Sequence, residues 1–305
     1  MTETPIVEIS DVARAFGRVL AISHLSFEVP RGTVSVLLGP NGAGKTTAVR
    51  LITGALRPDR GSIRVFGQDP QNLGEQIRVR CGIVSAKPAL YDRLTGRDNL
   101  RYAAQLYGVS DGTRVDEAAE RFGISGALDL RVGGYSTGMK SRLALARAIL
   151  HDPDLLLLDE PTAGLDPEAA RAVLALIDWM AGTGKTVIMC THLLLEAEGI
   201  ADQVVIMDRG ASIVAGSPDE LSRRYWPPTV VVDAEDRDKL FEVLPRLKGV
   251  VEIKREGPAI VQLDDLSRVP ALVKTLVGRD LRLTRVEPMT PSLEELYFVI
   301  QRTNR

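Results

Sequence analysis

Several kinds of residue are scarce in this sequence, and each scarcity excludes a class of protein. The 305 residues include only two cysteines, Cys81 and Cys190. They lie far apart, and Cys190 ends the apolar run 187–190, so we expect buried free thiols in a reducing compartment rather than a disulfide framework. No window approaches the roughly 20 consecutive apolar residues that a membrane span needs. If the protein works at a membrane, we expect a different protein to cross it.

An excess of charge of either sign is also lacking. Lys and Arg number 38, Asp and Glu number 40, and the formal net charge is −2. Such a chain offers no basic field for counterion release, so nucleic acid is a disfavoured partner. The first residues, Met1–Pro5, lack the basic region and apolar core of a secretory signal. The length favours two domains, or one domain with large subdomains.

The hydrophobic pattern changes its period along the chain. Short apolar stretches with turn residues between them predict strands up to residue 38, and a helix pattern opens at Lys45. Helical spacing dominates residues 94–150, which we interpret as an inserted helical subdomain. Further strands, the first two separated by a helix over 167–180, are predicted at 155–158, 187–190 and 204–207. Fully apolar strands that alternate with helices indicate a buried parallel sheet.

The last part of the chain has a separate pattern of its own. The stretch Tyr225–Pro228 predicts a linker, because two prolines block a helix and favour extended backbone. Beyond it we predict a strand at 230–232, a helix at 237–247, strands at 250–254 and 259–263, a helix at 266–277, a strand at 281–286 and a helix from Ser292. This order is β-α-β-β-α-β, the split βαβ arrangement. The predicted domains are therefore 1–224 and 225–305, the second being a small α+β domain.

A phosphate-binding motif follows the predicted strand 34–38. Residues 39–46 read Gly-Pro-Asn-Gly-Ala-Gly-Lys-Thr and match the pattern G-x-x-x-x-G-K-[ST] between a strand and a helix. The N–H groups of such a loop and of the helix N-terminus form an anion site. Lys45 can then reach the β- and γ-phosphates of a nucleotide, and Thr46 can hold Mg²⁺. The alternative interpretation is a glycine-rich hairpin turn.

Two acidic residues end another predicted strand. Asp159 follows the apolar run 155–158, where a strand end can deliver a carboxylate to Mg²⁺ beside the phosphates. Glu160 comes next, and a carboxylate at that place can polarise the water that attacks the γ-phosphate. Taken alone, the pair could also be a solvated strand end. Together with the phosphate loop it predicts nucleotide hydrolysis.

Further motifs point to one family. Residues 135–139 read Tyr-Ser-Thr-Gly-Met and, with residues 142–148, resemble the signature motif of ATP-binding cassette (ABC) ATPases. Residues 159–166 are similar to the D-loop region of that family, and His192 is similar to its switch histidine. The resemblance covers about residues 5–222. It implies an α/β P-loop cassette with a mainly parallel sheet core, an antiparallel β subdomain and an inserted helical subdomain.

The resemblance also implies how ATP is held and used. The implied residues are Glu160, His192 and Lys45 for catalysis, Thr46 and Asp159 for Mg²⁺, and, for ATP, Phe16 stacked on adenine with Gly39, Pro40, Asn41, Gly42, Ala43, Gly44, Lys45, Thr46 and Thr47. Ser136 and Gly138 are expected to act in trans, on ATP held by the partner in a head-to-tail homodimer. Such dimers sit on the cytoplasmic face of a membrane and drive separately encoded transmembrane subunits.

One position departs from the family pattern. After the strand 81–84 the family usually has a glutamine that contacts Mg²⁺ and the attacking water, and the aligned residue here is Ala86. A methyl group can neither ligate a metal nor orient water, which puts part of the activation or coupling chemistry in doubt. Ser85 or Lys87 could compensate, although Lys87 would bring a cation rather than an acceptor.

Two stretches narrow the class within the family. The spelling Ser-Thr-Gly-Met-Lys at 136–140 and the ending at 291–298 are similar to cassettes of ABC-2-type multidrug and antibiotic-resistance exporters. The leading prediction is therefore the ATPase subunit of such an exporter. The alternatives are a soluble ABC ATPase without a transport role and a regulatory cassette that hydrolyses ATP weakly.

Overall fold

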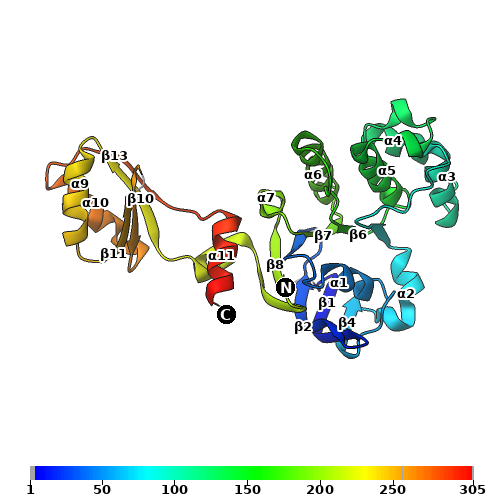
Figure 1. Ribbon diagram of the computed structural model, residues 1–305, viewed down its shortest axis with the longest axis horizontal. Coiled ribbons are helices and arrows are strands. Elements are labelled where there is room, and N and C mark those ends of the chain that lie inside the picture. The colour runs from blue at the N-terminus through cyan, green and yellow to red at the C-terminus, as the bar shows by residue number, and fades with distance from the viewer. Residues whose placement is uncertain (1–3, 256, 304–305) are drawn as a thin grey trace. The chain divides into compact units, whose positions relative to one another are not determined.

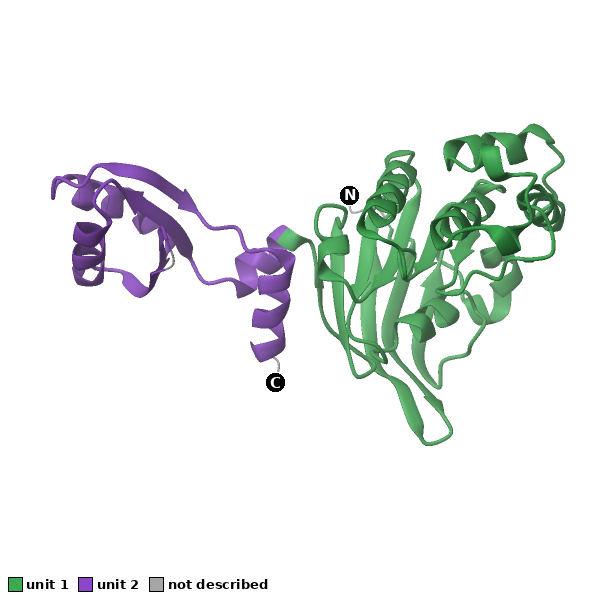
Figure 2. Ribbon diagram, turned by 45° about the horizontal axis from the view of Figure 1, so that its top comes forward, with its two compact units in different colours: residues 1–218 green, residues 219–305 purple. Residues whose placement is uncertain are grey.

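The chain folds into two compact units (Figures 1 and 2). The computed structural model describes residues 4–255 and 257–303. The first unit spans residues 1–218 and the second residues 219–305. The boundary falls at the start of α8 (Pro218–Tyr225), whereas the sequence places it after residue 224. Within the described residues, no helix is both long enough and apolar enough to cross a membrane.

One nine-stranded sheet runs through the first unit, in the order β4-β1-β2-β9-β8-β3-β7-β6-β5. The strands are β1 (Val7–Phe16), β2 (Val19–Val29), β3 (Val34–Leu38), β4 (Arg60–Val65), β5 (Cys81–Val84), β6 (Leu155–Asp159), β7 (Thr186–Thr191), β8 (Gln203–Asp208) and β9 (Ala211–Gly216). The run from β8 to β5 is parallel, and β1 pairs antiparallel with β2 and β4. The predicted fold class, a mainly parallel core with an antiparallel part, is confirmed.

The central strands are apolar because helices cover the sheet. Every residue of β3, β6 and β7 is buried, so these strands show no alternation of polar and apolar side chains. Since the three strands are adjacent and parallel, their carboxyl ends meet at one edge of the sheet. That edge carries the loops that follow Leu38, Asp159 and Thr191.

The first unit contains seven α-helices in its described residues, and three of them form a separate group. They are α1 (Lys45–Ile52), α2 (Pro70–Arg78), α3 (Gly96–Leu106), α4 (Thr113–Arg121), α5 (Thr137–Ile149), α6 (Pro167–Gly182) and α7 (Leu194–Ala197). Helices α3, α4 and α5 contact one another and lie together in Figure 1, as the inserted helical segment that the sequence predicts. Thr95 and Asp98 cap the start of α3 reciprocally, which explains why this helix begins there. Helix α1 contributes Ala48, Val49, Leu51 and Ile52 to the main core.

The second unit contains a four-stranded antiparallel sheet in the order β11-β12-β10-β13. Its elements are β10 (Thr229–Ala234), α9 (Arg237–Val243), β11 (Val250–Arg255), β12 (Ala259–Leu263), α10 (Val269–Val277), β13 (Leu283–Pro288) and α11 (Leu293–Thr303). Alternate residues of β10 and β12 pack with residues of α9 and α10 in one apolar core. This is the β-α-β-β-α-β order expected from the sequence, and it places both helices over one face of the sheet.

Candidate active site

A glycine-rich loop connects β3 to α1. Gly44 directly precedes α1 and has φ 103°, a left-handed conformation that favours glycine. A Cβ there would lie 2.6 Å from Ile22 Cδ1 and 2.9 Å from the carbonyl oxygen of Ala21, and one at Gly39 would lie 2.3 Å from the carbonyl oxygen of Met207. The fixed glycines of the motif are therefore required by backbone conformation and by close packing. With this shape the loop presents N–H groups at a helix N-terminus, where an anion binds favourably.

Lys45 is held beneath this loop. Its side chain is only 6% exposed, and Nζ donates hydrogen bonds to the carbonyl oxygens of Gly39 at 2.7 Å and Pro40 at 3.3 Å. Nζ also lies 3.3 Å from Oε1 of Glu160. A buried ammonium is stable only with such partners. The lysine is thus fixed where phosphate oxygens bound by the loop can reach it.

Asp159 and Thr46 meet at the start of α1. The Thr46 hydroxyl donates to Oδ2 of Asp159 at 2.7 Å, whereas the buried Oδ1 has no hydrogen-bond partner among the described residues. Burial raises the pKa of the Asp159 carboxyl, and the hydrogen bond from Thr46 opposes the rise. A hydroxyl and a carboxylate with one unused oxygen are hard ligands of the kind that Mg²⁺ prefers. These two residues therefore fit a magnesium ion beside the phosphate loop.

Glu160 and His192 form the second contact at this edge. Nδ1 of His192 lies 2.8 Å from Oε2 of Glu160. The backbone of Glu160 has φ 51°, and its N–H donates to the carbonyl oxygen of Cys190 at 2.9 Å. A left-handed non-glycine residue costs about 1–3 kcal/mol and persists only where the surroundings enforce it. Oε1 has no hydrogen-bond donor within the described part of the chain, because the 3.3 Å ion pair with Lys45 lacks hydrogen-bond geometry. This oxygen is buried against the Lys45 ammonium.

The loop and Glu160 line a cavity of about 440 Å³. Its lining comprises Val19, Leu20, Ala21, Asn41, Gly42, Ala43, Gly44, Lys45, Thr46, Thr47, Ala86 and Glu160. Val19 and Leu20 are exposed apolar side chains that the sequence reasoning missed. They lie at the start of β2 and belong to none of the motifs found in the sequence. They offer an apolar wall beside the phosphate site.

Three of the expected ATP contacts lie outside both the phosphate loop and the lining of its cavity. Phe16 is 43% exposed at the end of β1, with the Arg14 guanidinium 5.0 Å from its ring centroid, and it is not among the residues that line the loop cavity. Ser136 caps α5 by accepting a hydrogen bond from the N–H of Met139 at 3.2 Å. Ser136 and Gly138 are also outside the lining of that cavity. Their roles toward ATP stay predictions.

Ala86 lies beside Glu160 in two cavities. It lines the loop cavity and a smaller one of about 180 Å³, whose other lining residues include Tyr135 and Lys140. The neighbouring Ser85 hydroxyl donates to the carbonyl oxygen of Lys87 at 2.9 Å and so shapes the turn. Ala86 therefore borders both cavities that Glu160 lines.

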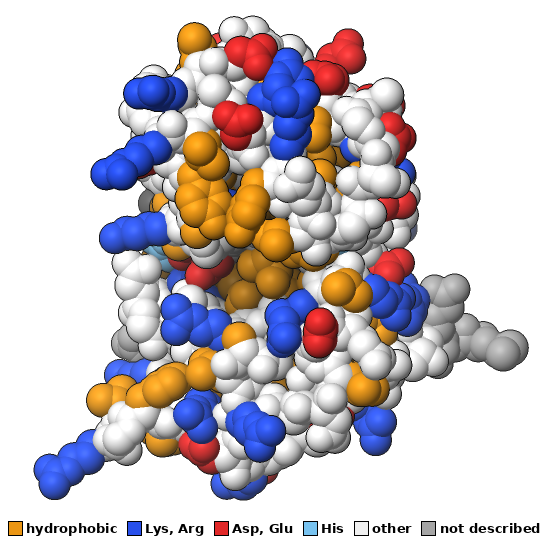
Figure 3. All heavy atoms as spheres, turned by 90° about the vertical axis from the view of Figure 1, so that its right-hand side faces the viewer, with side chains coloured by type: hydrophobic (Ala, Val, Ile, Leu, Met, Phe, Trp, Pro, Cys, Tyr) orange, Lys and Arg blue, Asp and Glu red, His pale blue; other side chains and the backbone are white. Residues whose placement is uncertain are grey.

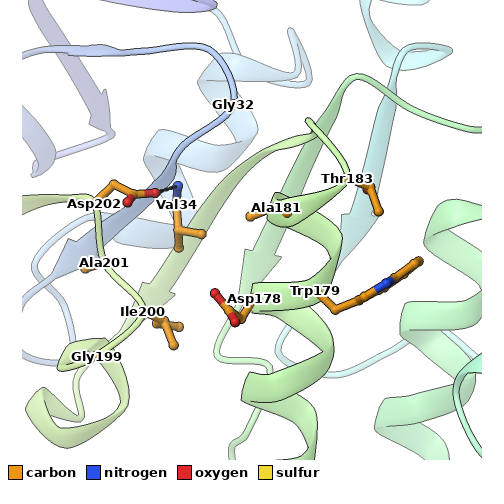
Figure 4. Close-up of a pocket in the computed structure, with 11 residues that line it drawn as sticks. Gly32, Val34, Asp178, Trp179, Ala181, Thr183, Gly199, Ile200, Ala201 and Asp202 are labelled. Atoms are coloured by element: carbon orange, nitrogen blue, oxygen red, sulfur yellow. Dashed lines mark hydrogen bonds between the residues drawn. The ribbon is translucent and has the colours of Figure 1, made fainter.

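A larger cavity, of about 530 Å³, lies at the opposite edge of the sheet (Figure 4). It is bounded by the start of β3, the C-terminal end of α6 and residues 199–202. The Asp202 carboxylate accepts a hydrogen bond from the N–H of Val34 at 2.8 Å. The lining has acidic side chains but neither a glycine-rich loop nor a cation, so a phosphate ligand does not fit there.

The fold, together with the phosphate loop and the acidic residues at the carboxyl ends of the strands, defines a P-loop nucleoside triphosphatase. Comparisons with known proteins then give the family. A family model described as ABC transporter matches residues 22–163. A bacitracin transport ATP-binding protein of Bacillus licheniformis is 36% identical over 96% of this chain and 96% of that protein. A daunorubicin resistance ATP-binding protein of Streptomyces coeruleorubidus is 33% identical over 98% of this chain and 96% of that protein.

A solved structure agrees with these relatives. The structure of an ATP binding subunit of an ABC transporter has a TM-score of 0.66 at 30% identity, covering 72% of this chain and 93% of that chain. The chain belongs to the ABC transporter ATP-binding proteins, which bind and hydrolyse ATP. The predicted family and the predicted ATPase activity are confirmed. In transporters of this family the ATPase subunits act with transmembrane subunits.

Proposed function

We propose that this chain hydrolyses ATP to drive export through separately encoded transmembrane subunits. The observation that carries the proposal is the convergence of Lys45, Asp159, Glu160 and His192 at the carboxyl ends of three adjacent strands. The export direction is supported by relatives named for bacitracin transport and daunorubicin resistance. Both match nearly the full length of the chain, including the second unit.

The residues divide the chemistry of hydrolysis between them. The loop N–H groups and Lys45 bind the phosphates, while Thr46 and Asp159 hold Mg²⁺, which neutralises phosphate charge when bound. The carboxylate of Glu160 accepts a proton from water as the water oxygen bonds to the γ-phosphorus. The bond from that phosphorus to the ADP oxygen breaks, and ADP leaves with the electron pair. His192, at 2.8 Å, orients the carboxylate.

The complete site is formed by two copies of the chain. Ser136 and Gly138 lie at the N-terminus of α5, which has 13 residues, and they are outside the loop cavity of their own chain. A helix N-terminus with a serine hydroxyl favours a phosphate. In a head-to-tail homodimer this end of α5 binds the γ-phosphate held by the partner, and Phe16 stacks on the adenine.

An apolar groove provides a docking surface for the transmembrane subunit. Exposed Tyr91, Tyr102, Leu106 and Tyr107, together with Arg147, line a cavity of about 210 Å³. Figure 3 shows hydrophobic side chains around a hollow on the face of the first unit that carries α2 and α3. An exposed apolar patch with a polar rim is typical of a protein interface. Docking there places the chain on the cytoplasmic face of the membrane.

A regulatory cassette with weak hydrolysis is the second candidate, and the position of Ala86 favours it. A methyl group lines both cavities beside Glu160, where the family has a glutamine. ATPase measurement of the chain with its membrane partner separates the two candidates. Turnover that responds to the transported substrate supports the export motor, whereas a uniformly slow rate supports regulation.

Replacement of the proposed base tests the function directly. Glu160→Gln keeps the size and hydrogen bonding of the side chain but cannot take a proton, so hydrolysis should fall about 100-fold or more. Because ATP is still bound, light scattering should detect an ATP-dependent dimer. Asp178→Asn, at an exposed site on the cavity of Figure 4, is the matched control and should behave as wild type. A Glu160→Gln variant that hydrolyses ATP normally and stays monomeric would refute the assignment.

A further inference from the structure

Three buried polar side chains form a closed cluster next to the active site. Thr162, Thr191 and Glu196 are 3%, 0% and 7% exposed. The Thr162 hydroxyl donates to Oε1 of Glu196 at 2.5 Å, and the Thr191 hydroxyl donates to Oε2 at 2.8 Å. A buried carboxylate is costly unless both its oxygens accept hydrogen bonds. Glu196 meets this condition only by tying two separate loops together.

The two loops are the ones that carry Glu160 and His192. Thr162 lies two residues after Glu160, and Thr191 directly precedes His192. The Thr191 hydroxyl oxygen also accepts the N–H of Leu193 at 3.0 Å, which closes the turn around the histidine. The 2.8 Å contact between His192 and Glu160 completes a ring of chain segments and hydrogen bonds. Glu196, on α7, completes this ring because its carboxylate accepts hydrogen bonds from both Thr162 and Thr191.

We propose that Glu196 is a positioning residue for hydrolysis, acting through both loops. This inference rests on the roles proposed for Glu160 and His192. Displacement of a reacting group by about 1 Å can cost on the order of 100-fold in rate. The phosphate loop does not depend on Glu196, because Lys45 is held by the carbonyl oxygens of Gly39 and Pro40. Loss of the tether should therefore lower kcat and leave the KM for ATP nearly unchanged.

Two conservative variants of Glu196 separate the effect of side-chain length from the effect of charge. Glu196→Gln keeps the length of the side chain and can contact both threonines, with its NH₂ group donating to one hydroxyl. Glu196→Asp keeps the charge but is one methylene shorter and cannot span both hydroxyls. For a tether, we expect Glu196→Gln to stay within about 3-fold of wild-type kcat. Glu196→Asp and Glu196→Ala should each lose about 10- to 100-fold. The control is Glu198→Ala, two residues along at an exposed position.

The test is steady-state ATPase of the full chain with MgATP, at a temperature where circular dichroism shows each variant folded. In a His192→Ala background, Glu196→Ala should cost less than it does alone, because the part of its effect that passes through His192 is already lost. Additive losses in the double variant would overturn the proposal, and so would full ATPase activity of Glu196→Ala. The proposal would also fail if Glu196→Asp kept its activity while Glu196→Gln lost it. If Glu196→Ala does not fold, the Gln and Asp pair decides. Glu160→Gln is assayed in parallel to separate a failure of the Glu196 proposal from a failure of the proposed function. Full activity of Glu160→Gln would refute the proposed function itself.

Discussion

Restoring an amide at position 86 should accelerate hydrolysis. Ala86 lines both cavities beside Glu160, whose Oε1 has no hydrogen-bond donor among the described residues. The glutamine of Ala86→Gln can order the attacking water and contact Mg²⁺. The phosphate loop is unchanged by this substitution. We therefore expect an effect on kcat rather than on nucleotide binding.

The magnitude follows from two opposing terms. A positioned polar group that acts on the transition state contributes about 2.7–4 kcal/mol. Ordering a glutamine side chain costs about 1.5–2 kcal/mol of conformational free energy, and residue 86 is in an exposed turn. The net gain of about 0.7–2.5 kcal/mol corresponds to a rise in kcat of about 3- to 70-fold. The Kd for ATP should stay within about 2-fold.

The assay is steady-state ATPase with the membrane partner present, together with nucleotide Kd by fluorescence titration. Lys87→Gln is the matched control, because it places the same amide at the adjacent position, which lines neither cavity. It should leave kcat near the wild-type value. A wild type that is already fast and does not respond to Ala86→Gln would refute the reasoning. Another side chain would then fill the role, and Ser85 would be the first to mutate.

Three further predictions concern the dimer, pH and stability. Mixing Lys45→Ala with Ser136→Arg protomers should restore activity that each homodimer lacks, since one composite site then has neither defect; confirmed heterodimers without recovery would contradict this. Burial lowers the pKa of His151 below its ordinary 6.5, so unfolding binds a proton and stability falls as pH drops below that value. The fall in Tm between about pH 7.5 and 5.5 should shrink in His151→Gln, and an equal fall would disprove the assignment. Asp166 accepts the N–H groups of Glu168 and Ala169 at the start of α6. Asp166→Ala should therefore lower the free energy of unfolding in urea by about 1 kcal/mol. Glu168→Ala is the control, and an unchanged urea midpoint for Asp166→Ala would contradict the prediction.

The sequence by itself determined the features that depend on neighbours along the chain. The loop 39–46 needs glycines at fixed offsets, and α1 begins at Lys45 as the motif requires. The apolar runs near 155–158 and 187–190 form strands, because only a sheet covered on both faces buries such runs completely. The ordered set of motifs was enough to predict the family, which the comparisons confirm.

The tertiary structure alone decided which side chains meet. Thr46 and Asp159 are separated by 113 positions in sequence, and their 2.7 Å contact exists because β3 and β6 both neighbour β7. The same assembly leaves Phe16 outside the lining of the loop cavity and brings Val19 and Leu20 into it. The ring through Thr162, Thr191 and Glu196 has no motif of its own. The sequence pattern predicts helices, strands and turns from residues that are close along the chain. A buried hydrogen bond between distant loops depends instead on how adjacent strands align their ends in the folded sheet.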